Sequence, residues 1–153
     1  MKKVMTGCQA TILSIIILII VGIISFNRIL SDNLSKTQIF KLVDKNYNII
    51  LEDIRNNNFD NTLTIKGIRE IDNENGVIDF YCGGKGMGSE TSYYGFYYTQ
   101  DDVPKGIFAG TKYCESEQLT ADGIGYSHNE YNGDNRYYTE KIRDKFYYYE
   151  AHY

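Results

Sequence analysis

Hydrophobic and polar residues follow three patterns along this chain, and each pattern predicts a different element. Residues 10–26 carry no charged side chain, whereas residues 34–54 place apolar side chains at intervals of three and four. From residue 59 onward, apolar and polar positions alternate over short stretches. Such patterns are typical of a membrane helix, an amphipathic helix and β-strands, respectively. We therefore expect an α+β protein in which an N-terminal transmembrane helix precedes one amphipathic helix packed on a mainly antiparallel, tyrosine-rich β-sheet.

The first pattern predicts a transmembrane helix over residues 10–30. Residues 10–26 alone would form about 26 Å of helix at 1.5 Å per residue, which is close to the thickness of the hydrocarbon layer. Lys2 and Lys3 precede the apolar run. The positive-inside tendency therefore places residues 1–9 in the cytoplasm and the body of the protein outside the cell membrane. The run is longer than in a typical cleaved signal peptide, which favours an uncleaved, single-pass anchor.

The second pattern predicts an amphipathic helix within residues 31–58. Ser35 followed by Gln38 forms a capping-box sequence at its start, and the asparagines at positions 56–58 favour its end. The recurring apolar residues lie on one face of this helix: Ile39, Leu42, Val43, Tyr47, Ile50, Leu51 and Ile54. Because that face has to be buried, we expect the helix to form a single domain with residues 59–153.

Turn-forming residues divide residues 59–153 into hairpins. Asn75-Gly76 suits a two-residue type I′ turn and predicts a hairpin between residues 61–71 and 76–82, in which Ile71 lies opposite Phe80. Asp122-Gly123 predicts a second hairpin, and residues 143–145 predict the turn between two tyrosine-rich strands. We expect a sheet of about five to seven strands.

Cys82 and Cys114 are candidates for a disulfide if the body lies outside the membrane. Closing a loop of about 33 residues would stabilise the fold by about 3 to 4 kcal/mol through the entropy of the unfolded chain. The alternative is two separate buried thiols, because Cys82 shares the predicted core face of its strand with Ile78 and Phe80.

Other candidate chemistry is sparse. His128 and His152 stand apart from each other, and no spacing of histidines or cysteines is typical of zinc, so we expect no metal and no cofactor. Residues 83–89 are rich in glycine but lack the order of a phosphate-binding loop, and we interpret them as a strand connection whose backbone could approach a ligand closely. An enzyme would require a cleft that joins a cysteine to a histidine, and we expect no enzymatic activity.

Charge excludes one class of partner. The chain has a net charge of −4, and its lysines and arginines are scattered. A nucleic-acid-binding protein needs a clustered basic face, so we expect no nucleic-acid partner.

The chain has fifteen tyrosines and no tryptophan, and all tyrosines except Tyr47 lie between residues 81 and 153. Tyrosine favours strands, so one side of each strand can pack against the helix while the other side keeps its hydroxyls in water. We predict a binding surface for a partner protein or a cell-wall glycan among seven rings: Tyr93, Tyr94, Tyr97, Tyr98, Tyr147, Tyr148 and Tyr149. The alternative is that these rings form cross-strand ladders that only stabilise the sheet.

Two motifs carry a resemblance to a known group. The stretches YYGFYYTQDDVP, at residues 93–104, and GDNRYYTEKIRDKFYYYEAHY, at residues 133–153, resemble uncharacterised membrane-anchored or secreted proteins of low-GC Gram-positive bacteria. The resemblance covers residues 68–153. It implies a small extracytoplasmic domain, and it assigns no catalytic or ligand-binding residue.

Three functions fit these features. The first is a single-pass membrane protein whose extracytoplasmic domain acts by binding or assembly. The second is a minor pilin-like filament or secretion-system subunit, because Lys2 to Gly7 resemble a prepilin leader before an apolar helix, although Ile12 stands where that family usually has glutamate. The third is a glycan-binding module.

Overall fold

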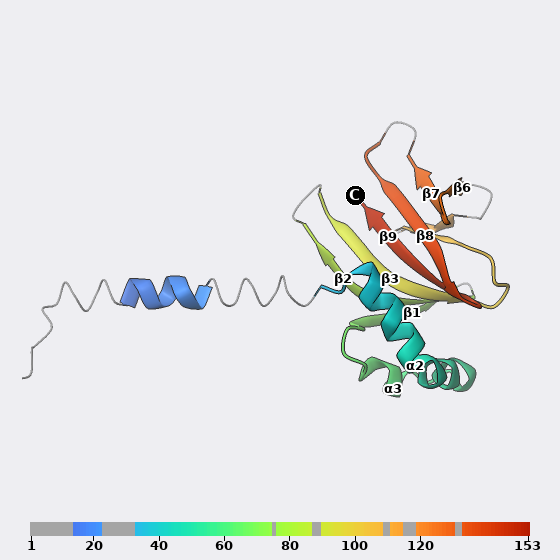
Figure 1. The fold of residues 1–153 in the computed structure, drawn as a ribbon, viewed down its shortest axis with the longest axis horizontal. Coiled ribbons are helices and arrows are strands. Elements are labelled where there is room, and N and C mark those ends of the chain that lie inside the picture. Colours follow the sequence, from blue (N-terminus) through green and yellow to red (C-terminus); the bar gives the residue numbers. More distant parts are fainter. Residues whose placement is uncertain are drawn as a thin grey trace, which may run out of the picture. The chain divides into compact units, whose positions relative to one another are not determined.

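The structure is a computed structural model, and it describes residues 14–22, 33–74, 76–86, 90–108, 111–114, 119–130 and 133–153. At residues 107–108 and 111–114 it describes the backbone alone. The chain divides into two compact units, Met1–Asp32 and Asn33–Tyr153. In the first unit the described residues, 14–22, form a helix. The second unit contains the elements labelled in Figure 1.

The prediction of a transmembrane helix over residues 10–30 is wrong. Within the described residues, no helix is long and apolar enough to cross a bilayer. The helix described in this stretch covers residues 14–22, about 14 Å at 1.5 Å per residue, whereas the hydrocarbon layer is about 30 Å thick. Residues 10–13 and 23–30 lie outside the described residues. The predictions of a single-pass membrane anchor, a cytoplasmic N-terminus and an extracytoplasmic body depended on this span and are corrected with it.

The prediction of an α+β body with a mainly antiparallel sheet is confirmed. Helix α2, Lys36–Asn56, lies on one side of a seven-stranded antiparallel sheet with the order β1-β2-β3-β9-β8-β7-β6 (Figure 1). The strands are β1 (Glu70–Glu74), β2 (Val77–Lys85), β3 (Ser92–Thr99), β6 (Thr120–Asp122), β7 (Gly125–Asn129), β8 (Arg136–Arg143) and β9 (Phe146–His152). The meanders β1-β2-β3 and β6-β7-β8-β9 meet where β3 pairs with β9. The chain between the meanders forms a separate hairpin of β4 (Gly106–Phe108) and β5 (Thr111–Cys114).

Helix α2 begins and buries its apolar face as predicted. The capping box is formed, and the backbone N–H of Ser35 donates to Oε1 of Gln38 at 2.7 Å. Asn57 ends the helix in the left-handed conformation, with φ of 49°. The apolar face packs on phenylalanines of the sheet, and the rings of Phe80 and Phe96 stack with centroids 4.6 Å apart. We call this cluster the helix-side core.

The predicted hairpins are present, with shifted boundaries. Ile71 lies opposite Phe80, which confirms the predicted register of β1 and β2. Asp122 pairs with Gly125, so the turn of the second hairpin lies one residue later than predicted. The strand predicted from residue 61 is wrong, because residues 60–63 form the short helix α3 (Asp60–Leu63) and β1 starts only at Glu70.

The side chain of Asp53 accounts for this correction. Its carboxylate, buried on α2, accepts hydrogen bonds from the backbone N–H of Thr62 at 2.7 Å, from Thr62 Oγ1 at 2.8 Å and from Asn61 Nδ2 at 2.9 Å. Burial by itself would raise the pKa of Asp53, but the hydrogen bonds from Asn61 and Thr62 outweigh burial and hold the pKa below its ordinary value. Residues 60–63 are therefore bonded to Asp53 of α2 and form a helical turn where a strand was predicted.

We expect the replacement Asp53→Ala to lower the free energy of unfolding by about 3 kcal/mol, because it leaves the Thr62 donors buried without an acceptor. Since the folded pKa of Asp53 lies below the unfolded value, this stabilisation is present above about pH 4 and is lost as the pH falls through the folded pKa. Urea unfolding at pH 7 and at pH 3 measures both effects. Glu52→Ala, at an exposed position on the same helix, is the control; equal midpoints for the two variants at pH 7 would contradict the prediction.

Candidate functional site

The face of the sheet opposite α2 carries a second core, which we call the tyrosine layer. Its members are buried and come from β2, β3, β8 and β9: Val77, Tyr97, Tyr137, Tyr147, Tyr149 and Ala151. The rings of Tyr97 and Tyr147 stack with centroids 5.4 Å apart, and those of Tyr137 and Tyr149 stack at 6.4 Å. Tyrosine therefore fills this face as a hydrophobic residue would, while its hydroxyls remain available for specific hydrogen bonds.

Those hydroxyls hold the segment 102–105, which we call the strap, against the sheet. Tyr97 Oη accepts from the backbone N–H of Lys105 at 2.9 Å, and Tyr137 donates to the carbonyl oxygen of Lys105 at 2.8 Å. Tyr147 donates to the carbonyl oxygen of Asp102 at 2.7 Å. Lys141 Nζ lies 2.6 Å from the Asp102 carboxylate and, with further hydrogen bonds, holds the pKa of Asp102 below its ordinary value. The polar groups of the strap are thus paired by side chains of the sheet.

The predicted tyrosine surface is largely interior. Of the seven rings, five are at most 7% exposed: Tyr94, Tyr97, Tyr147, Tyr148 and Tyr149. Tyr93 and Tyr98 keep partial exposure. These five rings are buried because both faces of the sheet are packed: α2 covers one face, and the strap lies against the other. Five of the predicted binding residues therefore belong to the core.

The two predicted disulfide cysteines are described unequally. Cys82 is a fully buried free thiol in the helix-side core, and its Sγ contacts the carbonyl oxygen of Phe80 at 3.5 Å. Burial raises the pKa of this thiol above its ordinary range. The structure therefore shows Cys82 unbonded, as in the alternative of separate buried thiols, and the side chain of Cys114 lies outside the described residues.

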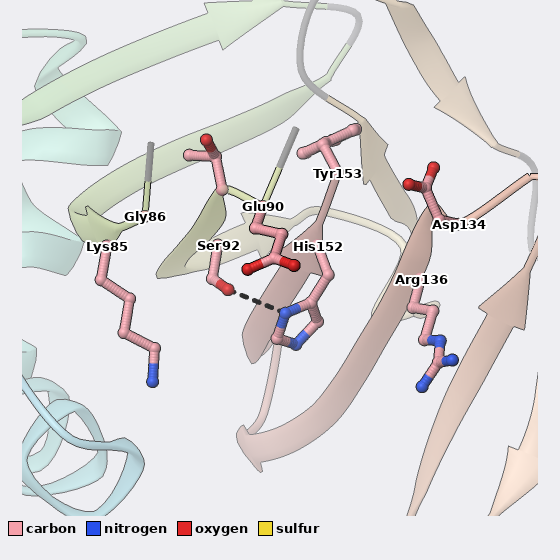
Figure 2. Close-up of a pocket in the computed structure, with 9 residues that line it drawn as sticks. Lys85, Gly86, Glu90, Ser92, Asp134, Arg136, His152 and Tyr153 are labelled. Carbon is pink, nitrogen blue, oxygen red and sulfur yellow. Dashed lines mark hydrogen bonds between the residues drawn. The ribbon is translucent and has the colours of Figure 1, made fainter. Parts of the chain in front are cut away.

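A pocket of about 590 Å³, lined mostly by polar and charged residues, lies where β2, β3, β9 and β8 end together. Strand register places Lys85 opposite Ser92, Ser92 opposite His152, and His152 opposite Arg136, so these four residues form one row across the sheet. Figure 2 shows the Ser92 and His152 side chains directed toward one another in the pocket. The row crosses three strand spacings, about 14 Å between its end residues. We call this the strand-end pocket.

A chain of hydrogen bonds connects the floor of the pocket to the helix-side core. Ser92 Oγ lies 2.8 Å from Nδ1 of His152, and Nε2 of His152 lies 3.1 Å from Oε1 of Glu150. The hydroxyl of Tyr148 donates to Oε2 of Glu150 at 3.2 Å. All members are satisfied when Ser92 donates to Nδ1 and the Nε2–H of His152 donates to the carboxylate. This arrangement fixes the imidazole and leaves lone pairs of Ser92 Oγ as acceptors.

Four charged residues surround this floor: Lys85 and Glu90 near β2 and β3, and Asp134 and Arg136 near β8 (Figure 2). All four are exposed, and none of their side chains has an ion pair or hydrogen bond with another residue in the described part of the chain. Two cations and two anions therefore face one pocket without neutralising each other. Such a set can accept and donate charge-assisted hydrogen bonds to a ligand.

The pocket unites residues that were not predicted together. His152 lies in it, as a cysteine–histidine cleft would have required, but its neighbour there is Ser92, while Cys82 is buried in the helix-side core. Lys85 and Gly86, from the glycine-rich stretch, also line it. Among the described residues, no group of three or more histidine, cysteine, aspartate or glutamate side chains could hold a metal ion.

No family model, curated protein or solved structure matches this chain. The resemblance to proteins of low-GC Gram-positive bacteria therefore stays a hypothesis, as does the pilin-like or secretion-system alternative. Fold and site together define the class as an α+β protein with a seven-stranded sheet and a polar pocket at one strand end.

Proposed function

We propose that this protein is a binding module that holds a small, charged, hydrogen-bonding ligand in the strand-end pocket. The observation that carries the proposal is a set of four exposed charges, Lys85, Glu90, Asp134 and Arg136, which have no ion-pair partner among the described residues and lie around the hydrogen-bonded pair of Ser92 and His152. A pocket lined by charges of both signs suits recognition through directed polar contacts more than it suits an apolar ligand. The volume, about 590 Å³, falls within the range of small-molecule sites.

Binding is favoured over catalysis by the surroundings of Ser92. The order Ser92, His152 and Glu150 matches that of a nucleophile, a base and an orienting acid. Acyl transfer would also need donors aimed at the developing oxyanion, usually backbone N–H groups. The amides beside the pair, those of Thr91 and Tyr153, donate to each other's carbonyl oxygens at 3.0 and 2.9 Å. The hydrogen-bond ladder thus occupies the backbone N–H groups of these two residues.

Titration of ¹⁵N-labelled protein with a panel of small anions, amino acids and sugar acids tests the proposal. We expect at least one compound to cause saturable shifts of the backbone amides of Lys85, Ser92 and His152. Arg136→Ala should weaken that binding about five- to tenfold, because one charge-assisted contact at an exposed site is lost. Arg55→Ala, which removes an exposed arginine from the last turn of α2, is the matched control. A panel that produces no saturable shift at these amides rejects the binding module.

A further inference from the structure

The mixture of charges narrows the chemistry of the ligand. A simple anion placed between Lys85 and Arg136 would also lie near the carboxylates of Glu90 and Asp134, which would repel it. Those carboxylates are acceptors only, so they need a ligand that brings hydrogen-bond donors. A ligand that satisfies both sets must therefore carry an anionic group together with several donors.

The hydrogen bonds of Ser92 and His152 at the floor of the pocket also favour a ligand that brings hydrogen-bond donors. Both ring nitrogens of His152 are used by Ser92 and Glu150, so the imidazole has no further donor for an anion when it is neutral. In this tautomer Ser92 Oγ donates its proton to Nδ1 and keeps its lone pairs as acceptors. The centre of the pocket therefore receives a hydroxyl more readily than an anionic oxygen, and the anionic group belongs at the cationic ends of the row.

An aromatic ring forms one wall of the site, on the tyrosine-layer side of the sheet. Tyr153 lines the pocket and packs edge-on against Tyr93, with centroids 5.8 Å apart, and Tyr93 in turn lies 6.1 Å from Tyr81. A supported, partly exposed ring of this kind offers an apolar surface beside polar groups. The C–H face of a pyranose ring has the matching character, because its hydroxyls project from the rim and leave its face apolar.

We infer that the strand-end pocket binds a carboxylated sugar, such as one uronic acid unit; this rests on the proposed function. The carboxylate pairs with the planar guanidinium of Arg136, which suits two parallel hydrogen bonds, or with Lys85 at the other end of the row. The sugar hydroxyls donate to Glu90, Asp134 and Ser92, and the ring face packs on Tyr153. Both carboxylates of the pocket and one of its two cations then have a partner of the correct sign.

Three probes separate the parts of this inference in the same ¹⁵N titration of the full chain: glucuronate, glucose, which lacks the carboxylate, and acetate, which lacks the hydroxyls. We expect glucuronate to bind at least about tenfold more tightly than either fragment, because only glucuronate satisfies both charge sets. If acetate binds as well as glucuronate, the sugar inference is overturned while the binding module survives. If glucose binds as well as glucuronate, the carboxylate requirement is overturned. If none of the three probes shifts the amides of the pocket, the sugar site is overturned. The binding module is rejected only if no compound of the full panel shifts them.

Two variants test the residue assignments. Arg136→Lys keeps the positive charge but loses the planar pair of donors, and it should weaken glucuronate and acetate binding alike, about threefold or more, while leaving glucose binding within about twofold. Tyr153→Ala should weaken glucuronate and glucose together and leave acetate unchanged. Tyr126→Ala, which removes a tyrosine that does not line the pocket and is 39% exposed, is its control. Equal effects of the two tyrosine variants on glucuronate would contradict the assignment of the wall.

Discussion

Replacing Gly95 by alanine is expected to destabilise the protein by about 3 kcal/mol or more. Gly95 lies in β3, an interior strand of the sheet, and a Cβ built there would stand 2.3 Å from the backbone carbonyl oxygen of Phe80 and 2.9 Å from the Tyr149 ring. The carbonyl cannot move without breaking the pairing of β2 with β3. Tyr149 cannot turn away without leaving the tyrosine layer, where it is buried.

Chemical denaturation followed by circular dichroism measures this loss. Gly22→Ala is the control, because a Cβ on Gly22 meets nothing within 4 Å, and it should leave the unfolding of the sheet unchanged. A Gly95→Ala protein that unfolds at the same denaturant concentration as the parent would show that β2 and β3 are not packed as described. An unfolded Gly95→Ala protein would agree with the expected direction. Tyr149→Phe is the milder variant at the same contact; it keeps the ring over Gly95 and should remain folded.

The second large effect is a fall in stability as the pH rises from about 4 to about 7, caused by Asp79. Burial is the main reason that the pKa of Asp79 is raised from 3.8 to about 7, and the hydrogen bond from Tyr149 opposes that rise only in part. One carboxylate oxygen, Oδ1, is buried without a partner among the described residues. The folded protein therefore keeps this carboxyl protonated at pH values where the unfolded chain releases the proton.

The sign follows from proton binding. Between the two pKa values the folded state binds more protons than the unfolded state, so the contribution of Asp79 is fully present below about pH 4 and is lost as the pH rises through 7. Asp79→Asn, which is neutral at every pH, should raise the free energy of unfolding at pH 8 by on the order of 3 kcal/mol and change it little at pH 4.

Urea unfolding of Asp79→Asn and of the parent, from pH 4 to pH 8, tests this expectation. Asp144→Asn is the control, because the Asp144 side chain is 91% exposed in a hairpin turn. The two pH profiles should converge in acid and separate near neutrality. Parallel profiles would mean that Asp79 does not carry the titration, and a parent that gains stability from pH 4 to pH 7 would assign the titration to other groups.

The parts of the fold that could be predicted from the sequence are those with local signals. The capping box at Ser35 and Gln38 places the start of α2, and the Asn75-Gly76 turn places Ile71 opposite Phe80. Both signals lie within a few residues of the elements that they define. The short helix at residues 60–63 could not be predicted in this way, because it depends on the distant carboxylate of Asp53.

The candidate site was harder to predict than the fold, because its register runs across four strands. Lys85, Ser92, His152 and Arg136 come together only through the pairing of β3 with β9, which no turn specifies. The burial of five of the seven predicted surface tyrosines could not be predicted for a related reason. Their alternation shows which rings share a face, but it cannot show that the strap returns to cover the second face. The visible signals of the pocket were the isolated His152 and the glycine-rich stretch that contributes Lys85 and Gly86.

The tyrosine layer also gives the protein an optical report of its own unfolding. Burial raises the pKa of Tyr97, Tyr147 and Tyr149 above the ordinary value of 10, so in the folded state these phenols stay neutral in alkali that would ionise exposed tyrosine. Their stabilising contribution is complete below about pH 10 and is lost as the pH rises further, so ionisation and unfolding become coupled. Because the pKa values of Tyr138 and Tyr148 in the helix-side core are raised as well, phenolate absorbance that appears late in an alkaline titration reports the opening of the sheet on both of its faces.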